Sequence, residues 1–116
     1  MTAAVATTHL SDQERRALTA LKEVMVRLLD EDLDRLVLFG SKARGDAEPG
    51  SDVDVAIVVR NLTAESRDRI LERVADVELE HLVPLSTLVL SVEQLERLRG
   101  RERRLALDLD REGVRL

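Results

Sequence analysis

The chain has 116 residues, a formal net charge of −5 and a hydrophobic share of 44% that is almost wholly aliphatic. Its single aromatic residue, Phe39, and its acidic balance disfavour nucleic acid as a main partner, because neither stacking nor a basic field is available. The absence of cysteine excludes disulfides and thiolate metal sites.

Length and hydropathy predict a single soluble domain. No apolar run approaches the roughly 20 residues of a membrane-spanning helix, and the N-terminus lacks the pattern of a signal peptide. We therefore expect a cytoplasmic protein with no membrane partner. Residues 1–10 read as a disordered tail, and residues 11–116 as one compact domain.

The first half of the chain predicts a helix and two strands. Ser11 and Glu14 have the spacing of a capping box, and apolar residues at helical spacing predict a helix over 12–30. The apolar run 35–39 is typical of a strand buried on both faces. The elements expected next are a helical turn, a loop and a second strand, at residues 41–44, 46–50 and 52–60.

The second half predicts helices around a third strand. Thr63 can cap a helix that ends near Leu82, because Pro84 stops it. The elements expected after it are a strand at 85–90, a short helix that follows Ser91 and ends at Gly100, and a last helix at 101–112. The order α-β-(turn)-β-α-β-α-α predicts an α+β fold with two layers.

Two carboxylates stand at the start of the second strand. Residues two apart in a strand point the same way, so Asp52 and Asp54 share one face while Val53 and Val55 face the opposite way. Like charges at this spacing are unfavourable without a cation, and Mg²⁺ or Mn²⁺ prefers such oxygen ligands. The alternative, that both are solvated residues at the strand entry, stays open on the pair alone.

The turn before these carboxylates has features of a phosphate-binding turn. Gly40 permits close approach of the backbone to a ligand, and Ser41 lies where a strand passes into a helix N-terminus. Lys42 and Arg44 add positive charge, or are solvated charges of the turn. An ordinary tight turn would explain Gly40 and Ser41, but a turn and a carboxylate pair together are more specific for a metal–nucleotide complex.

These residues carry a resemblance to a known family. Gly40–Ser41, ten intervening residues and Asp52-x-Asp54 resemble the signature of the DNA polymerase beta-like nucleotidyltransferases. The longer pattern Phe-Gly-Ser-x-Ala-Arg-Gly, the small size and the element order resemble its minimal, MNT-type members. The resemblance implies a nucleotidyltransferase fold, with a small mixed β-sheet flanked by helices.

The resemblance also implies an activity and a partner. Such proteins transfer a nucleoside monophosphate from a Mg²⁺-bound nucleoside triphosphate, here ATP, to a hydroxyl. Gly40, Ser41, Lys42 and Arg44 would contact the nucleotide, while Asp52 and Asp54 would hold Mg²⁺ or Mn²⁺ and act in catalysis. MNT-type members are antitoxins that attach AMP to a tyrosine of a HEPN-domain toxin, or bind it. We expect a homodimer or a hetero-oligomer with that partner.

One feature departs from the family pattern. Fully equipped members carry a third carboxylate on the next strand, where this chain has Ser86 or Thr87, and a hydroxyl is a poor general base. Glu78 or Glu80 could substitute, although helical carboxylates are more often solvated. The alternative function is therefore a catalytically weak nucleotide- or toxin-binding module that neutralises its partner by complex formation.

Other candidate sites are weaker. His9 and His81 have no second ligand at zinc spacing. Arginines crowd residues 97–104, but acidic neighbours dilute them, which favours a solvated surface or the rim of a protein interface over a nucleic-acid site.

Overall fold

The computed structural model describes residues 9–48, 50–101, 109 and 113–116. The elements follow one another as α1 (Asp12–Leu29), the 3-10 turn η1 (Asp30–Asp32), β1 (Leu33–Phe39), α2 (Gly40–Arg44), β2 (Val53–Val59), α3 (Ala64–His81), β3 (Leu85–Ser91), α4 (Val92–Arg101) and β4 (Val114–Arg115).

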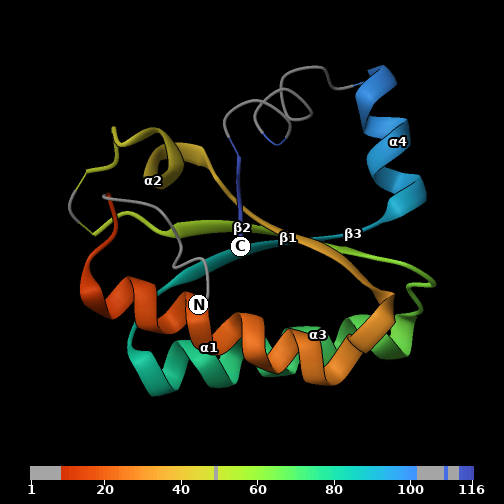
Figure 1. The fold of residues 1–116 in the computed structure, drawn as a ribbon, viewed down its shortest axis with the longest axis horizontal. Coiled ribbons are helices and arrows are strands. Elements are labelled where there is room, and N and C mark those ends of the chain that lie inside the picture. The colour runs from red at the N-terminus through yellow and green to blue at the C-terminus, as the bar shows by residue number, and fades with distance from the viewer. Residues whose placement is uncertain (1–8, 49, 102–108, 110–112) are drawn as a thin grey trace.

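The described strands form one mixed sheet in the order β3-β2-β1-β4. β2 and β3 are parallel, while β1 is antiparallel to both β2 and β4. In Figure 1, α1 and α3 lie side by side under one face of the sheet, and α2 and α4 lie on the other side. The predicted α+β class, with a small mixed sheet flanked by helices, is confirmed.

Alternation along β2 separates two apolar layers. Val53, Val55 and Ile57 belong to the larger core cluster, which α1 and α3 cover, whereas Ala56 and Val58 belong to a smaller cluster with α4. A strand buried on both faces in this way reads as an almost continuous apolar run. This burial requires apolar residues along most of β2, but not at its charged start.

The long helices begin where the sequence predicts. In α1, the Ser11 hydroxyl accepts from the Glu14 amide at 3.1 Å and the Glu14 carboxylate accepts from the Ser11 amide at 2.9 Å. The Gln13 side-chain amide donates to the carbonyl of His81 at 2.7 Å, which ties the start of α1 to the end of α3. The two helices therefore run antiparallel under the sheet (Figure 1).

Several boundaries differ from the prediction. Leu10, assigned to the tail, is 5% exposed and belongs to the larger core, while residues 1–8 lie outside the described part of the chain. β2 begins at Val53 rather than 52, and Gly100 lies within α4 instead of ending it. The helix expected at 101–112 falls almost wholly on residues that the structure does not describe.

The short edge strand β4 was not predicted from the sequence. Val114 and Arg115 pair with Leu38 and Val37 of β1, and the Leu116 amide donates to the carbonyl of Leu36 at 2.9 Å.

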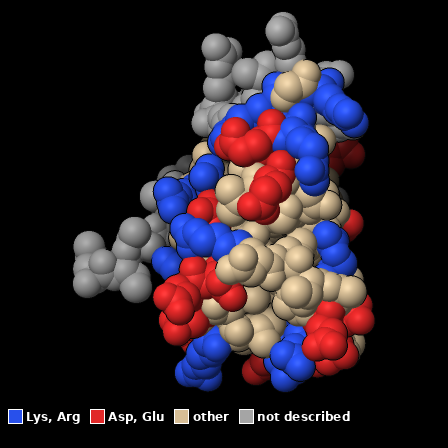
Figure 2. Space-filling view, turned by 90° about the vertical axis from the view of Figure 1, so that its right-hand side faces the viewer, with Lys and Arg blue, Asp and Glu red and all other residues tan. Residues whose placement is uncertain are grey.

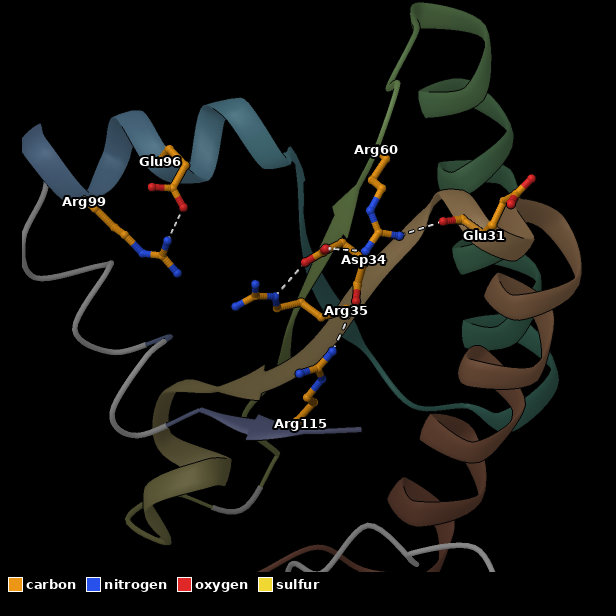
Figure 3. A network of polar contacts seen from close by, with 7 residues as sticks. All are labelled: Glu31, Asp34, Arg35, Arg60, Glu96, Arg99 and Arg115. Atoms are coloured by element: carbon orange, nitrogen blue, oxygen red, sulfur yellow. Dashed lines mark hydrogen bonds and ion pairs between the residues drawn. The ribbon is translucent and has the colours of Figure 1, made fainter.

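A network of polar contacts surrounds Asp34 of β1 next to this edge, as Figure 3 shows. The Asp34 carboxylate accepts from Arg35 and from Arg60, each at 2.8 Å, and the Arg115 guanidinium donates to the Asp34 carbonyl at 3.3 Å. No helix among the described residues is long and apolar enough to cross a membrane.

Candidate functional site

Asp54 lies in the middle of a row of three residues across the sheet. It pairs with Phe39 at the end of β1 and with Ser86 at the start of β3. Its neighbours Val53 and Val55 are fully buried on the face that α1 and α3 cover, which we call the helix-covered face. The Asp54 side chain therefore faces the other side, where α2 lies. This half-buried carboxylate is the centre of the candidate site.

Asp52 lies just before β2 and is exposed, so strand alternation does not fix its direction as the sequence suggested. The charge of Asp52 nevertheless acts on Asp54, since it is one of the causes that raise the pKa of the Asp54 carboxyl. No group of three or more His, Cys, Asp and Glu side chains within the described residues could hold a metal ion. A cation held by this carboxylate pair would therefore need further oxygens from its ligand.

Gly40 makes the closest approach to Asp54. A Cβ atom built on Gly40 would lie 2.3 Å from Oδ2 of Asp54, and the φ angle of Gly40 is +73°, which L side chains rarely adopt. Glycine is thus required here on two counts. It brings the start of α2, with Ser41 in its first turn, directly against the carboxylate.

The pKa of the Asp54 carboxyl lies above its usual value, chiefly because burial disfavours its charged form. The charge of Asp52 raises it further, whereas a hydrogen bond from Ser86 and the charge of Arg44 lower it. The ionised form is therefore short of positive charge. A divalent cation beside Asp52 and Asp54 would supply that charge, so the donor set fits Mg²⁺ or Mn²⁺.

The two predicted cationic contacts of the turn are differently placed. Arg44 pairs with Asp46 at 3.2 Å, and its charge lowers the pKa of the Asp54 carboxyl. Lys42 is only 8% exposed, and its Nζ lies 2.8 Å from Oε2 of Glu14 in α1. Lys42 is therefore not a solvated charge, and its ammonium is engaged by Glu14. Sequence reasoning missed this role for Glu14, since the capping box accounted fully for an acid at that position.

The strand register identifies which hydroxyl stands where a third acid was expected. Ser86 is the parallel partner of Asp54, whereas Thr87 partners Val55 and therefore lies on the helix-covered face. Glu78 accepts from the Leu85 amide at 2.9 Å and so anchors the start of β3, and Glu80 is exposed.

The remaining candidates lie elsewhere. The His9 ring lies against Gly45 at the end of α2, and the carbonyl of His81 is occupied by Gln13. Arginines of α4 mix with acids, and Arg99 pairs with Glu96. Among the described residues, Figure 2 shows blue and red side chains interspersed on this face, and residues 102–104 of the arginine stretch lie outside them.

Comparisons with known proteins identify the family. The sequence profile of the nucleotidyltransferase domain family matches residues 18–107. A protein of Methanocaldococcus jannaschii named "putative protein adenylyltransferase MJ0141" is 35% identical over 69 residues, which are 59% of this chain and 70% of that protein. A solved "putative nucleotidyltransferase" from Sulfolobus solfataricus is 21% identical and covers 76% of this chain and 81% of its own, with a TM-score of 0.47.

Proposed function

This chain belongs to the nucleotidyltransferase domain family, and from that premise we propose that it is a protein adenylyltransferase, which transfers AMP from ATP to a protein hydroxyl. The observation that carries the proposal is the contact of the Gly40 backbone with the Asp54 carboxylate. It sets a turn suited to phosphate beside a carboxylate suited to metal. The name of the M. jannaschii relative supports a protein as the acceptor.

Each site residue has a proposed part in the reaction. Asp52 and Asp54 would hold Mg²⁺ or Mn²⁺, which when bound supplies positive charge next to the reacting phosphate. The backbone of Gly40 and the Ser41 side chain would hold the terminal phosphates, and Arg44 would add charge from the same turn. A bond then forms between the acceptor oxygen and the α-phosphorus, the bond to the β-phosphate breaks, and pyrophosphate and the hydroxyl proton leave.

The acceptor that the sequence resemblance suggests is a tyrosine of a HEPN-domain toxin, with this chain as its antitoxin. One observation favours a second candidate function. Ser86, beside Asp54, offers only a hydroxyl where a carboxylate would help remove the acceptor proton. A chain with this substitution could bind Mg²⁺–ATP or the toxin and neutralise the partner by forming a complex.

A mass measurement distinguishes the two functions. The protein is incubated with ATP, Mg²⁺ and the product of the reading frame adjacent to its own, as the candidate partner, and the intact mass of that product is recorded. A gain of one AMP or more, lost in Asp52→Asn and Asp54→Asn and kept in Asp68→Asn, is the expected result. Asp68 is a matched control because it is an exposed aspartate of α3.

Two other results would contradict the proposal. A stable complex without any mass change, formed equally by the Asp52→Asn variant, would show that the chain acts as a binding module and not as an adenylyltransferase. Absence of both the adduct and the complex would exclude this partner, and absence of ATP binding as well would exclude the nucleotide site.

A further inference from the structure

The first described residues of the chain contact the helix that follows the phosphate turn. We propose that residues 9–14, which we call the N-terminal brace, position the Gly40–Ser41 turn for nucleotide, with Glu14 as a positioning residue that acts through Lys42. This inference rests on the proposed function, because the turn matters only if it binds nucleotide. The brace precedes residue 18, where the match to the family profile begins.

The central contact of the brace is the ion pair between α1 and α2. Oε2 of Glu14 lies 2.8 Å from Nζ of Lys42, and the two side chains are 16% and 10% exposed. Burial raises the pKa of the Glu14 carboxyl, yet hydrogen bonds from Lys42 and Ser11 outweigh it, and that pKa lies below its ordinary value. The Glu14 carboxylate is therefore ionised at neutral pH, and removing either partner of this buried contact leaves the other poorly solvated.

The two oxygens of Glu14 have separate tasks. Oε1 accepts from the Ser11 amide at 2.9 Å and completes the cap of α1, while Oε2 binds Lys42. α2 is thus attached to the N-terminus of an 18-residue helix that is itself well capped. A long helix with one face buried in the core is a firm support for a short one.

One further contact of the brace reaches α2, and the brace also shares an apolar core with that helix. Leu10 is buried in the larger core, where Ala43 of α2 also packs. The His9 ring lies so close to Gly45 that a Cβ there would be 2.7 Å from its Cε1 atom. The brace therefore contacts the middle and the C-terminal end of α2.

α2 is short and, besides the brace, it contacts β1 and β2. It is five residues long, begins at Gly40 with φ +73° and is followed by its C-cap Gly45 with φ +85°. Hollows of about 290 Å³ and 230 Å³ flank Lys42, the first lined also by Glu14 and the second also by His9. Because Gly40 contacts Asp54 directly, a shift of α2 would change the distance between the Gly40–Ser41 turn, which would hold phosphate, and the Asp54 carboxylate, which would hold the metal.

Charge-specific variants separate this role from direct phosphate binding by Lys42. Glu14→Gln keeps an oxygen for the Ser11 amide but removes the charge that Lys42 needs. Lys42→Met removes the other partner, and Lys42→Arg retains the pair. Glu23→Gln and Lys22→Met are matched controls, since both residues are exposed on α1.

The first measurement is the affinity for Mg²⁺–ATP by titration. Glu14→Gln and Lys42→Met should each weaken binding by about tenfold or more, because small displacements of binding groups are costly. The double variant should be no weaker than either single variant, Lys42→Arg should bind nearly as the parent does, and the controls should be unchanged. Weakening in Lys42→Met with none in Glu14→Gln would overturn the proposal and make Lys42 a direct phosphate contact.

The second measurement is amide hydrogen exchange without nucleotide. The amides of Gly45 and Asp46, both bonded to the Ser41 carbonyl, should exchange faster in Glu14→Gln while those of β2 do not. Unchanged exchange at both amides would overturn the brace. This readout does not require ATP binding, so a chain that fails to bind ATP would refute the proposed function while the brace is still tested.

Discussion

At the scale of the residue, the site depends on how closely Gly40 and Asp54 approach each other. The Gly40 backbone occupies the space beside Oδ2 of Asp54, and Ser86 and Arg44 act on the same carboxylate from β3 and α2. The Asp54 side chain is therefore held by its neighbours before any cation arrives. Such preorganisation is what lets fixed groups act on developing charge without rearranging.

Gly40→Ala should remove the activity. The added Cβ would meet Oδ2 of Asp54 at 2.3 Å, so either the carboxylate or the turn must shift. We expect adenylyl transfer, or Mg²⁺–ATP affinity, to fall by about 100-fold, the effect of a displacement near 1 Å.

Gly50→Ala is the matched control for Gly40→Ala. Gly50 also has a positive φ, +84°, but a Cβ atom added there would have nothing within 4 Å. Both variants should lose stability by about 1–2 kcal/mol from the left-handed backbone, measured by urea unfolding. Equal loss of activity in the two variants would contradict a specific role for the Gly40–Asp54 contact.

Ser86→Asp should increase adenylyl transfer. Ser86 is the register partner of Asp54, so an aspartate there would bring a third carboxylate to the same face of the sheet. A positioned base contributes about 100-fold or more in favourable cases, and we expect at least tenfold in the rate of single-turnover transfer. Thr87→Asp is the control, because it would place the charge on the helix-covered face and lower stability without any gain in rate. No gain in Ser86→Asp would show that a base on β3 does not limit transfer.

At the scale of the element, α3 ends in a way that its sequence does not favour. Leu82 caps the helix with φ 55° and ψ 40°, in the left-handed region, and its side chain is 77% exposed. Glycine is the usual residue at such a position, because the Cβ of any other residue crowds the backbone there. The exposed leucine gains little burial in return.

Leu82→Gly should therefore stabilise the protein. Relief of the left-handed conformation outweighs the added entropy of the unfolded chain, and we expect a gain of about 0.5–1 kcal/mol. Thermal unfolding should show a rise in Tm of about 2–6 °C. Leu79→Gly, at a 76% exposed position inside α3, is the control and should lower Tm instead. A lower Tm in Leu82→Gly would mean that the side chain makes a stabilising contact.

The elements also show where local signals end. The apolar runs of β1, β2 and β3 and the capping residues Ser11 and Thr63 were sufficient to predict five elements to within two or three residues. β4 could not be predicted, because two residues carry no periodicity and pair only through contacts with β1. α4 is described as far as Arg101, one residue past Gly100, where the sequence placed its end.

At the scale of the whole molecule, the two faces of the sheet are covered differently. α1 and α3 cover one face with the larger core, and the candidate site opens on the other face beside α2 (Figure 1). The sequence could nominate the residues of the candidate site because Gly40–Ser41 and Asp52-x-Asp54 lie within one short stretch, and their roles stay a prediction. It could not predict the choice of Ser86 over Thr87 or the Glu14–Lys42 pair, since both depend on strand register and helix packing.

The placement of Asp54 also sets the stability of the metal-free protein. Burial raises the pKa of its carboxyl in the folded state, so stability falls as pH rises from the ordinary pKa of an aspartate through this higher value. Near neutral pH, the ionised carboxylate therefore opposes folding. Asp54→Asn should raise Tm modestly in EDTA at neutral pH, and the difference should shrink below about pH 4.

Mg²⁺ should reverse the order of the two Tm values, so that the parent protein becomes more stable than Asp54→Asn. The parent protein should gain stability that grows with the logarithm of the metal concentration once its folded state binds the metal, whereas Asp54→Asn has lost a metal-binding carboxylate and should gain little. The measurement is Tm of both proteins in EDTA and in millimolar Mg²⁺ with a non-hydrolysable ATP analogue, across pH 4 to 8. A lower Tm for Asp54→Asn in EDTA would mean that the hydrogen bond with Ser86 outweighs the cost of burying the charge. If instead Asp54→Asn has the higher Tm in EDTA and the lower Tm in Mg²⁺, the carboxylate is retained for its ligand although it destabilises the fold.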